Sequence, residues 1–140
     1  YLTIEHHSAI PVELRPAIGN RIFGCDDCQL VCPWNKFARK AAHPDFKVRH
    51  SLDSTSLTEL FRWTAQEFEE RTLGSAIHRL GYVRWSRNIA VALGNAPASP
   101  EVIEALEERR EDGSPLVREH VEWALTRQRS LKGAAPHRDA

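Results

Sequence analysis

The chain has 140 residues, and its 19 lysines and arginines balance its 19 aspartates and glutamates, so its formal net charge is zero. A neutral chain is not a uniformly basic nucleic-acid-binding protein, and any surface for a polyanion must be local. There is no apolar run long enough to span a bilayer and no signal peptide. We therefore expect one compact domain or two small units in a soluble, cytoplasmic protein that does not contact membranes.

The first part of the chain predicts short elements. Residues 1–5 alternate apolar and polar side chains, which predicts a short strand or an extended lead-in. Pro11 suits the first position of a helix and Gly19 the position just after one, so a short helix is expected between them. The chain then reaches Gly24, whose missing Cβ allows the backbone to turn closely around an inorganic centre.

All three cysteines lie close together, in a C-x2-C-x3-C-P motif formed by Cys25, Cys28, Cys32 and Pro33. The first pair can direct two thiolates at one centre, and the proline ends the ligand loop because it fixes φ and has no amide donor. In bacterial two-cluster ferredoxins, the cysteine before proline ligates the other cluster. We therefore predict that Cys25 and Cys28 bind one [4Fe–4S] cluster and that Cys32 binds a second.

Other roles for the cysteines fit the motif less well. Structural zinc usually has four ligands, and His43 and His50 are too far apart in sequence to supply the second pair. The odd cysteine count disfavours a disulfide framework, and unligated core cysteines explain neither the clustering nor Pro33. Three cysteines leave a cubane one ligand short, so we expect this chain to be a piece of a longer protein, kept in a reducing compartment.

The composition changes after the cysteine motif. Lys36 begins a group of three cations at residues 36–40, which either contact a phosphate or partner beside the redox centre or form a solvated helix end. Residues 41–56 lack apolar periodicity and are expected to be a linker. We therefore predict a partial ferredoxin-like region over residues 1–50, a helical domain over residues 51–130 and a disordered tail over residues 131–140.

The second half has the apolar spacing of amphipathic helices, in residues 57–63, in residues 85–93 and in stretches starting at Ser99 and Ser114. Thr64 and Glu67 have the spacing of a capping box at the start of a further helix. Residues 94–97, Gly-Asn-Ala-Pro, are expected to end the helix before them. Ser99 and Ser114 each precede proline, as N-caps do. The repeated Ser-Pro starts predict HEAT-like helical repeats packed on the preceding helices.

A mixture of cations, glycines and aromatic residues separates the two halves. It contains His78, Arg79, Arg84 and Arg87. Arg84 and Arg87 are three positions apart, hence neighbours on one helical face, near an N-terminus whose amides attract anions. Cations there oppose the helix macrodipole, which favours a phosphate-binding role over a purely structural one. We predict that these four residues, together with Lys36, contact phosphates.

Several phrases together resemble the C-terminal part of the epoxyqueuosine reductase family, namely residues 1–5, 13–16, 18–21, 24–35 and 87–95. The resemblance implies a cobalamin- and iron–sulfur-dependent enzyme that reduces epoxyqueuosine in a tRNA anticodon loop to queuosine. It also implies an upstream cobalamin domain, a two-cluster ferredoxin-like domain and a C-terminal HEAT-like domain that helps to hold tRNA. The fold class expected for this chain is therefore mainly α, formed by the second half of the ferredoxin-like region followed by the helical repeats.

The resemblance also implies roles for particular residues. Two [4Fe–4S] clusters and cobalamin would be the cofactors, and the tRNA anticodon stem-loop and an external electron donor would be the partners of a monomer. Asp26 and Asp27 are candidates for contacts with the corrin amides, although they could instead cap backbone amides of the loop. The basic residues would contact tRNA. The family's catalytic acid and remaining cluster ligands precede the matching segment, so we predict no catalytic residue here and expect the chain alone to be inactive. His7 and Ser8 stand where relatives usually carry a basic residue and glycine.

Two alternatives belong to other functional classes. A cobalamin-dependent reductive dehalogenase would share the two-cluster pattern but would have no use for an arginine-bearing helical repeat. A non-enzymatic HEAT-like interaction module with a zinc knuckle would use the same cysteines for structure. Binding to tRNA distinguishes the first alternative, and metal analysis distinguishes the second.

Overall fold

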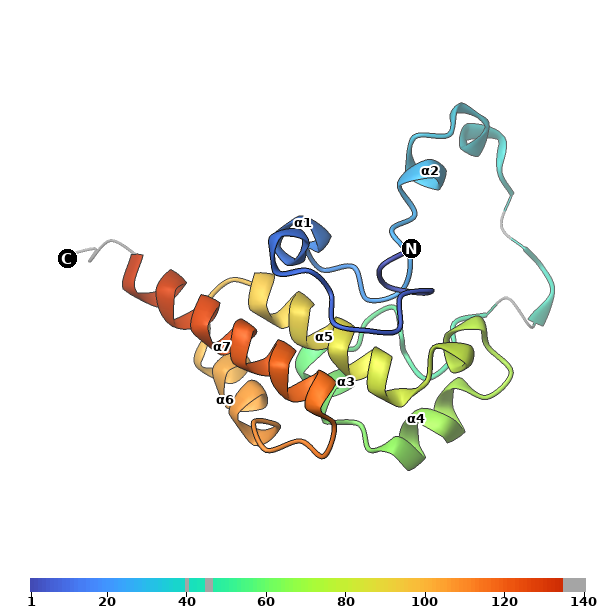
Figure 1. Ribbon diagram of the computed structural model, residues 1–140. Coiled ribbons are helices and arrows are strands. Elements are labelled where there is room, and N and C mark those ends of the chain that lie inside the picture. Colours follow the sequence, from blue (N-terminus) through green and yellow to red (C-terminus); the bar gives the residue numbers. More distant parts are fainter. Residues whose placement is uncertain (40, 45–46, 135–140) are drawn as a thin grey trace, which may run out of the picture.

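The computed structural model describes residues 1–39, 41–44 and 47–134, and these residues form helices and no strand (Figure 1). The helical elements in chain order are η1 (Val12–Leu14), α1 (Arg15–Ile18), α2 (Asp27–Leu30), η2 (Pro33–Phe37), α3 (Leu57–Arg62), α4 (Ala65–Thr72), η4 (Ala76–Leu80), α5 (Tyr82–Asn95), α6 (Pro100–Glu108) and α7 (Pro115–Ala134). The mainly α fold class predicted from the sequence is confirmed. Among the described residues, no helix is long and apolar enough to cross a bilayer.

The two long helices α5 and α7 lie side by side and form the centre of the molecule (Figure 1). Ile89 and Leu93 of α5 and Val121 of α7 are fully or almost fully buried in the same core. A Cβ on Gly94 would come within 2.5 Å of the Trp123 ring, so this glycine permits the close approach of α7. Helix α5 ends at Asn95, within the predicted stop at residues 94–97, and Gly94 itself still lies inside the helix.

Side-chain caps start the shorter helices. The hydroxyl of Thr64 and the carboxylate of Glu67 form the predicted capping box of α4. A second capping box, between Ser56 and Glu59, starts α3. The hydroxyl of Ser99 accepts a hydrogen bond from a backbone amide of α6, as predicted. These caps satisfy amides that have no partner within the first helical turn.

The structure differs from the sequence predictions at both ends of the chain. Residues 1–5 form a turn and not a strand, with the Glu5 amide donating to the Tyr1 carbonyl at 2.9 Å. The helix expected after Pro11 is split into η1 and α1, and α1 ends at Gly19 with a positive φ of 63°. Helix α7 includes residues 131–134, which were expected in the disordered tail. The rest of that predicted tail lies outside the described residues.

The N-terminal segment packs on the helical body before the chain leaves it. Ile10 and Ile18 are buried against Val91 of α5. Beyond this contact, α2 and η2 lie on an excursion of the chain that extends away from the other helices (Figure 1). Residues on both sides of the predicted domain boundary near residue 50 therefore pack against each other. The division into a cluster-binding region and a helical domain stays a prediction.

Candidate metal centre and its support

The three cysteines lie on the excursion, around α2 and η2. Asp26, between the first two, has a left-handed backbone with φ 55° and starts α2. Its carbonyl accepts hydrogen bonds from two amides of that turn, each at 2.9 Å. No disulfide involves the cysteines; Cys25 and Cys28 are exposed and Cys32 is half-buried. The loop therefore presents two exposed thiols and one half-buried thiol on one short stretch of backbone.

The chemistry of the loop fits an iron–sulfur cluster. Thiolates are the usual ligands of such clusters, and a fourth ligand would have to come from elsewhere. The described residues contain no preformed group of three or more metal-binding side chains. Leu30, Val31 and Trp34 beside the cysteines are 74–80% exposed. Exposed apolar side chains in such number are typical of a contact surface, and covering them would shield the cluster from water.

The two aspartates of the motif have different surroundings. An oxygen of Asp27 accepts a hydrogen bond from Arg21 at 2.9 Å, and both side chains are partly exposed. The Asp26 side chain does not cap α2. The sequence analysis gave a second possible role for Asp26 and Asp27, the capping of backbone amides of the loop. No such cap is present at the start of α2. Contact with a corrin stays a prediction for both residues.

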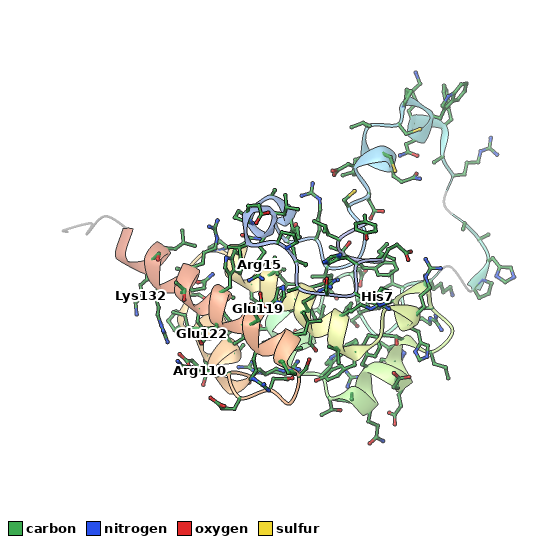
Figure 2. The ribbon with its side chains drawn as sticks, in the orientation of Figure 1. His7, Arg15, Arg110, Glu119, Glu122 and Lys132 are labelled. Carbon is green, nitrogen blue, oxygen red and sulfur yellow. The ribbon has the colours of Figure 1, made fainter. Side chains whose placement is uncertain are left out.

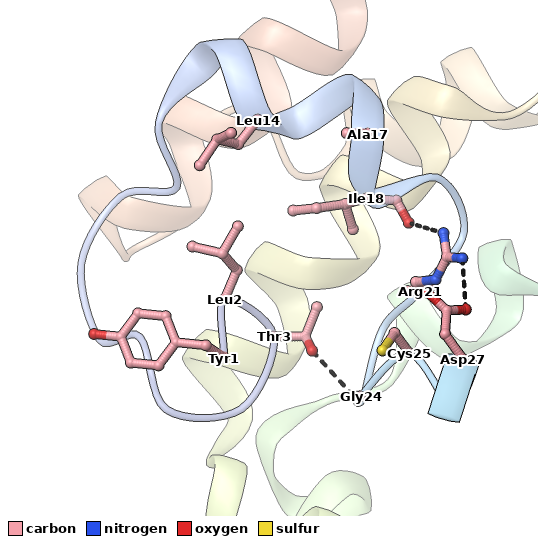
Figure 3. Close-up of a pocket in the computed structure, with 10 residues that line it drawn as sticks. All are labelled: Tyr1, Leu2, Thr3, Leu14, Ala17, Ile18, Arg21, Gly24, Cys25 and Asp27. Atoms are coloured by element: carbon pink, nitrogen blue, oxygen red, sulfur yellow. Dashed lines mark hydrogen bonds and ion pairs between the residues drawn. The ribbon is translucent and has the colours of Figure 1, made fainter. Parts of the chain in front are cut away.

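A pocket of about 350 Å³ lies beside the first cysteine (Figure 3). Leu2, Leu14 and Ile18 supply its apolar wall, and the Arg21–Asp27 ion pair lies at the side where Cys25 lies. The pocket therefore combines apolar surface with one thiol of the motif.

Helix α5 holds the backbone just before the cysteines. The amide group of Asn88, which is fully buried, donates to the carbonyls of Thr3 and Ile22, each at 2.8 Å. The Thr3 hydroxyl in turn accepts a hydrogen bond from the Gly24 amide at 3.0 Å (Figure 3). The entry to the cysteine loop is thus tied to both the N-terminal turn and α5.

The prediction that Arg87 contacts phosphate is wrong for this structure. Its guanidinium is fully buried and donates to the carbonyls of Leu2, His6 and Ser8 at 2.7–2.9 Å. Burial, and to a lesser extent the nearby charge of Arg84, lowers the pKa of Arg87 to about 10, so it remains charged at neutral pH. Arg87 therefore binds the N-terminal segment of its own chain.

Arg84, one turn earlier, lies at a small hollow of about 150 Å³ with Arg79 and His7. Its guanidinium donates to the carbonyls of Ile4 at 2.9 Å and of Arg79 at 3.0 Å. The His7 ring lies 3.5 Å from Arg84, and the Arg79 guanidinium lies 3.8 Å from Glu5. The structure thus brings the predicted residues Arg79 and Arg84 together at one hollow, and His7, which was not predicted, lies there too. Contact of these residues with phosphate stays a prediction.

The other two predicted phosphate contacts lie in different surroundings. His78 stacks on Phe68 with ring centroids 6.4 Å apart, and its Nε2 lies 3.4 Å from Glu69. Lys36 is exposed, with its amine 4.9 Å from the centroid of the Phe37 ring. Helix η2, which carries Lys36, lies on the excursion and away from α5, which carries Arg84 (Figure 1).

A second buried polar network was not predicted from the sequence. Arg15 is 2% exposed, donates to the Ile10 carbonyl at 2.8 Å and pairs with Glu119 at 2.5 Å (Figure 2). The ring of His120 accepts from the Ile10 amide at 3.1 Å. Asn88 and Asn95 were missed as well, although they are polar residues two helical turns apart beside the apolar stripe of α5. That placement is the signal that could have identified them.

Comparisons with known proteins agree with the motif. Residues 1–35 match a family described as a 4Fe-4S double cluster binding domain. The chain is 64% identical over 127 residues to the epoxyqueuosine reductase of Pseudomonas aeruginosa, covering 91% of the chain and 35% of the relative. It is 52% identical over 134 residues to that of Escherichia coli, covering 96% of the chain and 35% of the relative.

Solved structures show the same likeness in three dimensions. An epoxyqueuosine reductase with an epoxyqueuosine-modified tRNA-Tyr stem loop superposes with a TM-score of 0.73 at 29% identity, over 88% of this chain and 33% of that chain. The Bacillus subtilis enzyme gives the same TM-score. The chain spans about a third of the length of the curated relatives it matches. Along that third, both sequence and fold confirm that the chain is similar to the epoxyqueuosine reductase family.

Proposed function

We propose that this chain is part of an epoxyqueuosine reductase and that Cys25, Cys28 and Cys32 are ligands of its [4Fe–4S] clusters. The observation that carries the proposal is the 52–64% identity to epoxyqueuosine reductases over about nine-tenths of the chain, including the cysteine motif. The disulfide-free thiols support it, because Cys25 and Cys28 are exposed and Cys32 is only half-buried. The double-cluster family match supports two clusters.

The proposed reaction removes the epoxide oxygen from epoxyqueuosine in tRNA. Two electrons and two protons are consumed, both carbon–oxygen bonds of the epoxide break, a carbon–carbon double bond forms and the oxygen leaves as water. Cobalamin, when bound, would supply low-valent metal chemistry for this reduction. Asp26 and Asp27 are the residues of this chain that would contact its amide groups. An external donor would supply the electrons.

The basic residues of this chain would bind the substrate. Arg79 and Arg84, with His7 beside them, present donors at one hollow, where a tRNA phosphate could accept hydrogen bonds. The tRNA stem loop in the structure of a relative supports a tRNA partner. We further propose a monomeric cytoplasmic enzyme in which the helices from α3 to α7 form a HEAT-like domain and residues 1–50 contribute to the cluster-binding region.

The test uses the complete enzyme that carries this segment, purified without oxygen. Iron, acid-labile sulfide, cobalt and zinc are measured per chain, and a stem-loop containing epoxyqueuosine is assayed for conversion to queuosine. We expect iron and sulfide sufficient for two clusters, and conversion that requires added reductant. Zinc in place of iron, or reduction of a halogenated compound without conversion of the stem-loop, would contradict the proposal.

A further inference from the structure

We propose that Asn88 is a positioning residue for the iron–sulfur site: its side chain fixes the backbone from which Cys25 reaches the cluster. The inference rests on the proposed function, because it assumes that Cys25 is a cluster ligand. It assigns a role to a residue of α5 that lies outside the cysteine motif in sequence and does not itself ligate metal.

The first argument is the geometry of the Asn88 side chain. Its two amide hydrogens are directed at two carbonyls from different parts of the chain, those of Thr3 and Ile22, each at 2.8 Å. Its oxygen accepts from the Arg87 guanidinium at 2.9 and 3.1 Å. The buried side chain therefore uses both donors and its acceptor, and its orientation is fixed.

The second argument is where the anchored backbone ends. Ile22 and Phe23 pack against the core of the helical body. Gly24 has a positive φ of 68° and donates its amide to Thr3 at 3.0 Å. The next residue is Cys25, which is exposed. Asn88 thus holds this stretch of backbone at two points. It binds Ile22 directly, and it binds Thr3, which in turn binds Gly24, one residue before the first thiol.

The third argument is that Arg87 reinforces the same arrangement. It donates to the carbonyls of Leu2 and His6, on both sides of Thr3 in the chain. The N-terminal turn is therefore held on α5 independently of the cysteine loop, and Asn88 links that turn to the loop. Residues that orient metal ligands affect metal retention and the properties of the metal without touching it.

The chain offers a matched control for Asn88. Asn95, seven residues later on α5, donates in the same way to two carbonyls, those of Arg15 and Gly19, at 2.8 and 3.1 Å. These carbonyls belong to α1 and its end, and not to the residues next to a cysteine. Asn88→Ala and Asn95→Ala each remove two hydrogen bonds between α5 and the N-terminal segment, but only the first removes a bond at the entry to the cysteine loop.

The experiment compares the two variants in the complete enzyme, loaded with iron and sulfide without oxygen. The measurements are the melting temperature, the electron paramagnetic resonance spectrum and midpoint potential of the reduced clusters, and the rate of iron loss to a chelator. We expect both variants to melt at lower temperature. Asn88→Ala should also shift the spectrum and potential of the cluster bound by Cys25 and lose its iron about tenfold faster. Asn95→Ala should leave the spectrum, the potential and the rate of iron loss unchanged.

Thr3→Val provides a second test if Asn88→Ala does not fold. This substitution keeps the shape of the side chain and removes only the oxygen that accepts from Gly24, so we expect a smaller change of the same kind. The inference would be overturned if the cluster properties were unaltered in Asn88→Ala, or if Asn95→Ala altered them equally. If only Thr3→Val can be measured, unaltered cluster properties in that variant would overturn it. Absence of iron and sulfide from the unmodified enzyme would instead refute the proposed function, so the two failures are distinguishable.

Discussion

The cysteine loop and the α5–α7 body differ in what holds them in place. In the body, Ile89, Val121 and Leu125 are completely buried, and the buried side chains of Arg87 and Asn88 hydrogen-bond to each other. On the loop, Val31 is 80% exposed and Trp34 is 74% exposed. Apolar burial stabilises the body, whereas we expect the loop to be stabilised by a bound metal cluster and by a partner surface that covers its apolar side chains. The difference indicates that loss of the cofactor should leave the helical body folded.

The largest expected effect that separates the two regions is loss of a cluster ligand. In the complete enzyme, Cys25→Ala and Cys32→Ala should each abolish conversion of the tRNA substrate, because each removes a ligand from a cluster. The crossed arrangement predicts that they damage different clusters, as measured by iron content and electron paramagnetic resonance. Damage to the same cluster by both variants, with the other intact, would contradict the crossing. Circular dichroism should show the helices of the body unchanged.

The converse test is a substitution within the body. Arg87→Ala would leave three carbonyls without their donor, at a cost of about 3 kcal/mol in the free energy of unfolding. Denaturation in urea measures this loss. Arg79→Ala is the matched control, since this side chain is 70% exposed and its removal should change stability by about 0.5 kcal/mol or less. Equal destabilisation by the two substitutions would refute the structural role assigned to Arg87.

Acid should weaken the body through His120. Burial lowers the pKa of this histidine to about 4, although its hydrogen bond to the Leu116 carbonyl acts in the opposite direction and the charge of Arg15 acts in the same direction. In the unfolded chain His120 takes up a proton near its ordinary pKa of 6.5, so the unfolded state binds more protons as the pH falls. We expect the free energy of unfolding to fall progressively by about 3 kcal/mol between pH 6.5 and 4, because only the unfolded state binds this proton in that range.

The pH dependence has its own control. His120→Gln removes the titrating group, so its unfolding free energy should vary less between pH 6.5 and 4 than that of the unmodified chain. Urea denaturation at a series of pH values measures both curves. Parallel curves would show that His120 is not the group responsible.

The smallest expected effect concerns the hollow between the N-terminal turn and α5. Arg79→Ala and Arg84→Ala in the complete enzyme should each reduce the salt dependence of tRNA binding by about one phosphate equivalent. The cluster spectrum should not change. Arg110→Ala is the control, because Arg110 lies beside Glu122 and away from His7 (Figure 2). A salt slope that neither Arg79→Ala nor Arg84→Ala reduces would exclude the hollow from tRNA binding.

Features that depend on neighbouring residues were predictable from the sequence. The cysteine spacing, the Thr64–Glu67 capping box and the N-cap at Ser99 each involve residues within a few positions of one another. Their geometry follows from local backbone periodicity, so they could be identified without knowing how the chain packs. The mainly α fold class follows from the same short-range patterns.

Features that depend on distant residues were decided only by the tertiary structure. Arg84 and Arg87 have equivalent places in a helical pattern, yet Arg87 is buried because residues 2–8, about 80 positions earlier, cover it. Gly94 resembles a helix end, but the Trp123 ring of α7 requires a residue without a side chain there. The sequence by itself determined which residues could ligate a metal and where the longer amphipathic helices of the second half form, because these depend on residue type and short-range spacing. Only long-range packing and hydrogen bonding determined which cations stay accessible and which polar groups hold the metal-binding loop.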